Sequence, residues 1–219
     1  MPRPRKVSDE DVFAATARAM SRLGPGELTL AAIAGEAGLT AGALVQRFGS
    51  KRELLLQLSA GAVDGNAAFI RGLREKHRSA LAVLRAYAEC LGDLAASPAA
   101  LARNLAYLQI DLTDPDFRKH LLAQAKATRA AIVDLLVDAI GDGELVPHVD
   151  ARALARVVET TLSGSLLTWA IYRDGGAARW LRGDLDAVLT PYLAPLLRQR
   201  SRRRPSRGGS RSRGSPPTG

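Results

Sequence analysis

The sequence predicts an all-α fold, and two observations carry that prediction. Apolar residues recur three and four positions apart along most of residues 7–197, whereas the alternation that is typical of strands is nearly absent. Residues that favour helix starts stand directly before these segments, and glycines and prolines separate them. We expect about nine helices, with an N-terminal three-helix unit followed by a C-terminal helical bundle.

The first predicted helix begins after Ser8, a good N-cap residue, and residues 9–11 place three acids where the helix dipole favours negative charge. Residues 24–26, Gly-Pro-Gly, end this helix. Two later helices begin with a cap residue followed by proline, at residues 97–98 and 114–115. The predicted helices after the first cover residues 29–36, 40–47, 50–75, 79–96, 98–111, 114–140, 150–173 and 184–199.

The net charge of +9 is unevenly distributed. Residues 1–6 carry three basic side chains and residues 198–219 carry eight, without an acid, so residues 7–197 hold 20 basic against 22 acidic residues. The excess indicates a polyanionic partner, which is a nucleic acid, a membrane surface or an acidic protein. Residues 200–219 consist mainly of Arg, Ser, Gly and Pro and are predicted to be disordered. This tail is a solvated extension, an added source of DNA affinity or a site for an acidic partner.

Several classes of protein are excluded. The single cysteine, Cys90, cannot form an internal disulfide, and no Cys/His spacing resembles a zinc site. The basic start lacks the apolar segment of a signal peptide, and the longest uncharged apolar stretch, residues 160–172, is shorter than the ~20 residues of a membrane span. No nucleophile elbow, His-Glu-x-x-His motif or phosphate-binding glycine loop is present. We expect a cytoplasmic protein that is not an enzyme and needs no metal or cofactor.

The most informative segment runs from Thr29 to Leu55. Thr29 caps a short helix with one buried face, Gly38 supplies a left-handed residue that turns the chain, and Thr40 caps the next helix. This second helix directs Leu44 and Phe48 inward. The layout is that of a helix-turn-helix, whose second helix enters the major groove of DNA.

The outward positions of this second helix are the predicted DNA contacts. Small residues at its N-terminal end allow the backbone to approach DNA closely, and the Thr40 hydroxyl suits a phosphate. Gln46 or Arg47 can reach a base edge or a phosphate, and Lys51 and Arg52 can hold the DNA backbone. The predicted DNA-binding residues are Thr29, Thr40, Ala41, Gly42, Ala43, Val45, Gln46, Arg47 and Lys51.

This segment resembles the DNA-binding domain of the tetracycline-repressor (TetR) family. The residues that match the family pattern are Thr29, Ile33, Ala34, Ala37, Gly38, Thr40, Gly42, Leu44, Phe48, Lys51 and Leu54. Val45 and Arg47 replace the usual Tyr and His of the pattern, so Arg47 can still serve a phosphate, whereas Val45 offers only apolar contact. The resemblance covers about a quarter of the chain, from residue 8 to about residue 60.

The resemblance implies a homodimeric DNA-binding transcriptional regulator, a repressor that a small-molecule effector releases from a palindromic operator. It also implies dimerisation through the last two long helices, here residues 150–173 and 184–199. The expected organisation is a DNA-binding domain over residues 8–60 with its motif at 29–48, an effector-binding and dimerisation domain over 61–199, and the Arg-rich tail over 200–219. Two alternatives stay open, namely a helical enzyme and a protein-interaction adaptor without specific DNA binding.

Two further features have both a functional and a structural interpretation. Small residues within 162–169 suit either a dimer interface or close packing inside one subunit. Several aromatic and polar side chains either line an effector pocket or belong to ordinary core and surface. The candidate pocket residues are Asn104, Tyr107, Phe117, Trp169 and Tyr172, with Gln109 beside them.

Overall fold

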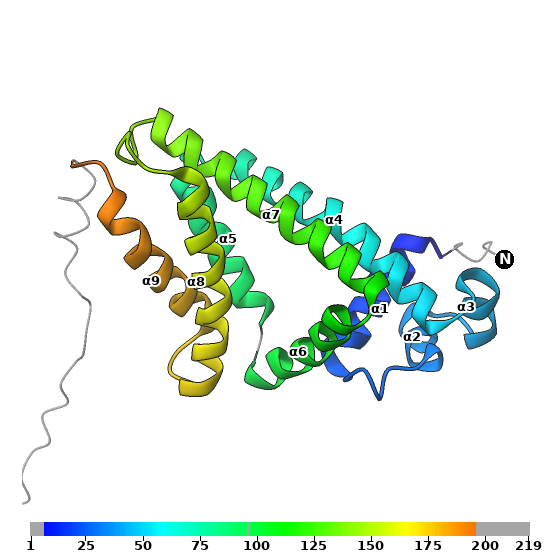
Figure 1. Cartoon of the computed structure of the whole chain (residues 1–219). Coiled ribbons are helices and arrows are strands. Elements are labelled where there is room, and N and C mark those ends of the chain that lie inside the picture. The colour runs from blue at the N-terminus through cyan, green and yellow to red at the C-terminus, as the bar shows by residue number, and fades with distance from the viewer. Residues whose placement is uncertain (1–6, 96, 196–219) are drawn as a thin grey trace, which may run out of the picture.

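The computed structural model describes residues 7–95 and 97–195, so the predicted Arg-rich tail lies outside the described residues. Within these ranges the chain forms nine α-helices and one 3-10 helix, in an elongated arrangement with α3 near one end and α9 at the other (Figure 1). In these ranges, no helix combines the length and the apolar character that crossing a membrane requires. The helices are α1 (Asp9–Arg22), α2 (Leu30–Ala37), α3 (Ala41–Phe48), α4 (Lys51–Lys76), α5 (Ala80–Leu94), α6 (Pro98–Thr113), α7 (Pro115–Gly141), α8 (Ala151–Tyr172) and α9 (Ala177–Leu189).

The predicted all-α fold is confirmed, and the starts of α2 to α8 lie within one residue of their predicted positions. Side-chain caps account for this accuracy. The Ser8 hydroxyl accepts a hydrogen bond from the Asp11 amide, and the Asp11 carboxylate accepts one from the Ser8 amide, which completes a capping box at α1. The later helix starts are capped in the same local way, by Thr29, Thr40, Ser50, Ser79, Ser97, Asp114 and Asp150.

The prediction of a last long helix over residues 184–199 is wrong within its described part, residues 184–195, and residues 196–199 lie outside the described residues. Helix α9 begins seven residues earlier, at Ala177, because Gly175 takes a left-handed conformation (φ +66°) and turns the chain directly after α8. It ends at Leu189 because Pro191 has no amide hydrogen and its ring is incompatible with a helix interior. The chain continues through the 3-10 helix η1 (Thr190–Tyr192), and Leu193 then forms an antiparallel bridge with Leu145.

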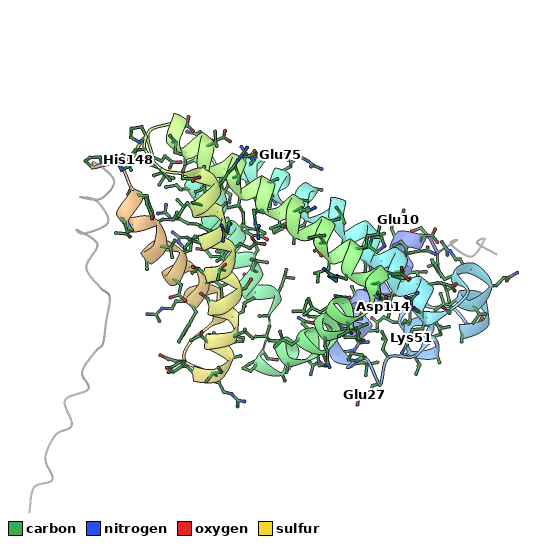
Figure 2. All side chains as sticks on the ribbon, viewed as in Figure 1. Glu10, Glu27, Lys51, Glu75, Asp114 and His148 are labelled. Atoms are coloured by element: carbon green, nitrogen blue, oxygen red, sulfur yellow. The ribbon has the colours of Figure 1, made fainter. Side chains whose placement is uncertain are left out.

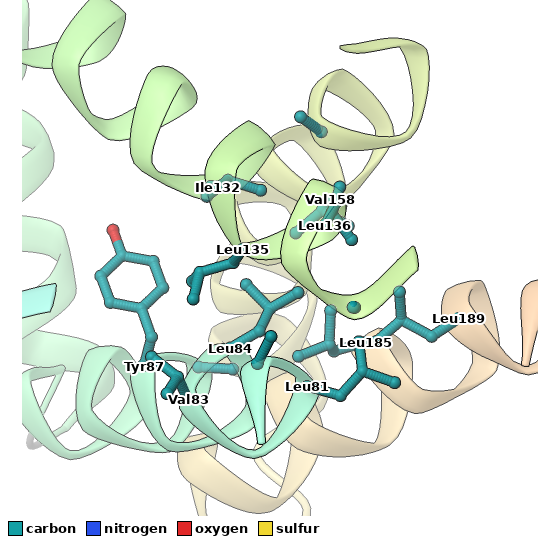
Figure 3. Close-up of a cluster of buried hydrophobic side chains, with 14 of the residues drawn as sticks. Leu81, Val83, Leu84, Tyr87, Ile132, Leu135, Leu136, Val158, Leu185 and Leu189 are labelled. Atoms are coloured by element: carbon teal, nitrogen blue, oxygen red, sulfur yellow. The ribbon is translucent and has the colours of Figure 1, made fainter. Parts of the chain in front are cut away.

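Two large hydrophobic clusters and a small one around Trp169 form the core of the described part of the chain. The first lies among α1, α2, α3 and the start of α4, with Leu54 as a member from α4. The second lies among α5, α7, α8 and α9, and Figure 3 shows part of it, including Leu84, Leu136 and Leu185. Ile70, near the end of α4, is also a member. Helix α4 contributes to both clusters and runs beside α7 (Figure 1), so it connects the N-terminal helices to the bundle.

Candidate nucleic-acid interface

The turn between α2 and α3 has the geometry of a helix-turn-helix. Gly38 ends α2 in the left-handed conformation (φ +68°), where a residue with a Cβ is strained. The Leu39 amide then donates to the Ala34 carbonyl at 2.9 Å, and the Leu39 side chain packs against the N-terminal core. Leu44 and Phe48 anchor α3 in the same core. This packing fixes which side of α3 faces outward.

The outward face of α3 carries most of the predicted DNA-binding residues. Gly42, Val45 and Gln46 are exposed, and Ala41 and Ala43 are half-buried beside them. Val45 is 49% exposed, so its side chain is accessible for apolar contact with a partner. This surface offers apolar contact, one amide side chain and close access to the helix backbone.

The two predicted threonines at helix starts act first as caps. Thr40 Oγ1 accepts a hydrogen bond from the Ala43 amide at 3.1 Å, and Thr29 Oγ1 accepts one from the Ala32 amide at 3.1 Å. Both threonines are exposed, and a hydroxyl that accepts one bond can still donate its proton. Each side chain therefore combines its structural role with a free donor direction for a phosphate oxygen.

Arg47 is turned toward the start of α1 rather than outward. Its guanidinium forms an ion pair with Asp9, donates to the Val7 carbonyl at 2.8 Å and lies over the Phe48 ring, 5.4 Å from the centroid. A guanidinium has five N–H donors, so these contacts leave donors available. A phosphate contact from Arg47 requires the side chain to share or exchange its Asp9 partner.

Lys51 connects the start of α4 to the loop between α1 and α2. Its ammonium donates to the Leu28 carbonyl at 2.8 Å and to the Pro25 carbonyl at 3.3 Å. An ammonium has three donors, so one remains for a phosphate. Substitution of Lys51 by alanine removes these two structural bonds as well, and it is therefore a poor isolated test of a DNA contact.

The structure pairs Arg52 with α7 instead of leaving it free for the DNA backbone, as the sequence suggests. Its Nη2 lies 2.8 Å from an oxygen of Asp114 and 2.8 Å from an oxygen of Asp116, and its guanidinium lies over the Phe117 ring. The Arg52 guanidinium holds the pKa of the Asp114 carboxyl below its usual range. Figure 2 shows Lys51 and Asp114 at this junction between the N-terminal helices and α7. Sequence reasoning missed this contact because its members lie 62 and 64 positions apart.

Helix α6 attaches to the end of α1 through two side chains. The Tyr107 hydroxyl donates to the Leu23 carbonyl at 2.9 Å, and Arg103 Nε donates to the Ser21 carbonyl at 3.0 Å. Burial raises the pKa of the Tyr107 hydroxyl. Tyr107, a candidate pocket residue, is thus part of the N-terminal hydrophobic cluster and holds α6 against α1.

A cavity of about 380 Å³ lies where α1, α4, α6 and α7 meet. It brings together two of the candidate pocket residues, Asn104 and Phe117. Sequence reasoning missed most of its wall, because only the packing of four helices brings these residues together. The lining residues are Ala17, Met20, Ser21, Leu58, Ser59, Ala62, Asn104, Asp111, Phe117, Leu121 and Gln124.

The other candidate pocket residues lie elsewhere. Trp169 is buried between α8 and α9, where its indole N–H donates to the Gly175 carbonyl at 3.0 Å. Tyr172 is 70% exposed and packs against Trp180. A second cavity of about 280 Å³ shares Leu121 and Gln124 with the first and extends toward α5 and α8. In the described ranges, no three His, Cys, Asp or Glu side chains gather to hold a metal ion.

Comparison with known proteins links both halves of this architecture to one group. The sequence model of a family described as "Bacterial regulatory proteins, tetR family" matches residues 12–58. A second, described as "Tetracyclin repressor-like, C-terminal domain", matches residues 104–184. Together they span more than half of the 219 residues. No curated protein matches the chain.

Several solved structures share the fold at low sequence identity. A TetR transcription regulator from Haloarcula marismortui is 19% identical, with a TM-score of 0.67, over 84% of this chain and 97% of its own. SmeT, the repressor of the Stenotrophomonas maltophilia multidrug efflux pump SmeDEF, is 20% identical, with a TM-score of 0.62, over 87% and 92%. FadR from Bacillus subtilis, solved in complex with stearoyl-CoA, is 17% identical, with a TM-score of 0.62, over 83% and 97%. At these identities the likeness establishes the arrangement of the helices.

Proposed function

Because the chain belongs to the TetR family and is a DNA-binding transcriptional regulator, we propose that it is a homodimeric repressor released from a palindromic operator by a small-molecule effector. The observation that carries this proposal is the outward face of α3. This face is exposed and has small residues at its N-terminal end, and Leu44 and Phe48 anchor the opposite face in the N-terminal hydrophobic cluster. In a two-fold dimer, two such helices enter successive major grooves about 34 Å apart.

The proposed dimer interface includes the outward face of α8. Leu162, Ser165 and Trp169 pack inside the subunit, which accounts for part of the small-residue segment 162–169. The opposite face of the same helix is apolar and exposed, with Leu167 at 46% and Ile171 at 77%. An apolar stripe of this kind on a helix supports coverage by a second copy of the chain.

The proposed release mechanism is a population shift. The cavity is lined by α1, which belongs to the N-terminal cluster, and by α4, α6 and α7, so an occupant can favour one relative placement of the N-terminal helices and the bundle. Helix α4 serves as the lever, since it contributes to both hydrophobic clusters. By linkage, an effector that weakens operator binding must itself bind less tightly when the operator is present.

Gln46→Ala is expected to change the sequence preference of the protein more than its overall DNA affinity. Gln46 is exposed on α3, and an amide side chain in the major groove discriminates among bases by about 1–3 kcal/mol. The measurement is selection of genomic fragments with the purified full chain, followed by comparison of the motifs that the wild type and the variant recover.

Gln109→Ala, an exposed glutamine on α6, is the matched control and should recover the wild-type motif. An equal loss of affinity for all sequences would assign Gln46 to the DNA backbone. If the wild type recovered no enriched motif at moderate salt, the repressor proposal would fail and an adaptor role would gain support.

Arg52→Ala is expected to reduce the coupling between effector and operator while leaving the fold intact. Arg52 connects the start of α4 to Asp114 and Asp116 at the start of α7, next to Phe117 in the cavity wall. Exposed ion pairs contribute little to folding, about 0–1 kcal/mol. The measurement is the ratio of operator affinities with and without a saturating effector.

Arg74→Ala is the matched control for Arg52→Ala. Arg74 also pairs α4 with α7, through Asp138, but at the end of α4 remote from the cavity. The expected result is a smaller coupling ratio for Arg52→Ala alone. Equal ratios in the two variants would mean that the Arg52 contact does not transmit the effector signal.

A further inference from the structure

The wall of the junction cavity is mostly apolar and comes from both halves of the molecule. Met20 comes from α1, Leu58 from α4, and Phe117 and Leu121 from α7. The polar side chains come from four helices and are Ser21, Ser59, Asn104, Asp111 and Gln124. An apolar chamber with a small number of polar groups is typical of a small-molecule site, in which the polar groups select the ligand.

Asp111 is the only charged residue among the described residues that line this cavity. It is half-buried on α6, and no described residue donates a hydrogen bond to its carboxylate or forms an ion pair with it. Two basic side chains near the cavity are engaged elsewhere, since Arg103 donates to the Ser21 carbonyl and Arg52 pairs with Asp114 and Asp116.

The environment of Asp111 disfavours its negative charge as long as no cation is present. Burial raises the pKa of the Asp111 carboxyl, because partial removal from water destabilises the ionised form. Partly buried carboxylates are normally paired or hydrogen-bonded. A ligand with a cationic N–H group supplies that partner, whereas a carboxylate ligand adds a second negative charge to the same small volume.

We propose that the junction cavity binds an amphipathic cation, whose apolar body lies against Met20, Leu58 and Phe117 and whose ammonium group pairs with the Asp111 carboxylate. The volume of about 380 Å³ suits a body the size of one aromatic ring with a short alkyl chain. The inference deepens the proposed function, because it names the chemical class of the effector. The ligand-binding claim itself holds whether or not an operator is found.

The first test uses a charge series of one shape on the full chain. The probes are 4-phenylbutylamine, 4-phenylbutanol and 4-phenylbutyrate, which place a cation, a neutral hydroxyl and an anion on the same apolar body. Affinities are measured by isothermal titration calorimetry at neutral pH. We expect the amine to bind about 10- to 100-fold more tightly than the alcohol, the range for a hydrogen bond to a charged group, and the butyrate to bind least tightly. Equal affinities for the three probes, or tightest binding of the butyrate, would overturn the proposal.

The second test removes the charge at Asp111. Asp111→Asn keeps the side-chain size, and we expect it to weaken binding of the amine about 10- to 100-fold while changing binding of the alcohol less than about threefold. Asp93→Asn, on the exposed side of α5, is the matched control and should bind the amine as the wild type does. An unchanged amine affinity in Asp111→Asn would assign the cation to another site.

A third variant tests whether the apolar body of the ligand occupies the cavity. Ala62 lines the cavity from α4, and Ala62→Phe is expected to weaken the amine and the alcohol together by filling part of the volume. The charge series on the unaltered protein stands independently of whether these variants fold. Operator binding without amine selectivity would overturn only the ligand class, whereas amine selectivity without an operator would overturn only the repressor proposal.

Discussion

Replacing Gly92 by alanine is expected to destabilise the C-terminal bundle by about 3 kcal/mol, near the upper end of the range for overpacking a core. Gly92 is buried where α5 crosses α9. A Cβ on Gly92 would lie 2.7 Å from the carbonyl carbon of Ala177 and still closer to the backbone of Ala178. Backbone atoms cannot rotate away as a flexible side chain does, so the two helices must move apart and lose contacts in the main core.

The measurement is urea unfolding followed by helical circular dichroism, with the free energy of unfolding compared between variant and wild type. Gly183→Ala is the matched control, because Gly183 lies within α9 and nothing stands within 4 Å of a Cβ built there. This control should be neutral or more stable by about 0.5–1 kcal/mol, since alanine loses less backbone entropy in a helix than glycine. Equal stability of Gly92→Ala and Gly183→Ala would mean that α5 and α9 are not closely packed.

Val45→Glu is expected to reduce operator affinity by at least about 100-fold, because placing like charges against each other at an interface costs several kcal/mol. Val45 lies on the outward face of α3 and is 49% exposed, so a carboxylate there meets phosphates or base edges while the core stays intact. The expected loss applies to every DNA sequence, unlike the change of preference expected for Gln46→Ala.

Fluorescence anisotropy with a labelled operator, at one fixed salt concentration, measures this loss. Val137→Glu introduces the same side chain at a similarly exposed site, 52% accessible, on α7. This control is expected to retain operator affinity and helical content. If Val45→Glu bound the operator as tightly as Val137→Glu did, α3 would not be the helix that enters the groove.

The helix-turn-helix was predictable because its signals are local. Thr29 and Thr40 cap the helices that they directly precede, and Gly38 takes its left-handed conformation at the position where the pattern requires one. Each of these effects depends on groups within about four positions along the chain, so it can be predicted without knowledge of the tertiary fold. The outward face of α3 follows from the same local pattern, once Leu44 and Phe48 are assigned to the core.

The last helix was mispredicted because its start has a weak local signal. Gly176 precedes α9 and provides no side-chain cap, in contrast to the Ser, Thr and Asp caps of the earlier helices. The helix is positioned instead by burial of Leu181, Leu185 and Leu189 against α5 and α8. A helix that depends on its packing partners cannot be delimited from its own residues alone.

The residues that line the cavity are even less predictable from the sequence than the start of α9, because they come from segments far apart in the chain. Of the residues predicted to line a pocket, Asn104 and Phe117 line this cavity. Tyr107 and Trp169 have the same kind of side chain as a pocket residue, but they pack in hydrophobic clusters elsewhere. Asp111 carries no distinguishing pattern in the sequence. Its significance comes from the absence of a described partner, which is a property of its surroundings.

The sequence of this protein therefore specified helices α1 to α8, their caps and the helix-turn-helix, because these features depend on hydrogen bonds between near neighbours and on the periodicity of single helices. Tertiary structure alone decided that Arg52 pairs with Asp114 rather than facing outward, that α9 starts at Ala177 and that Asp111 faces a cavity. These features arise where segments tens of residues apart pack together, and the energy of such packing depends on the shape and charge of both partners.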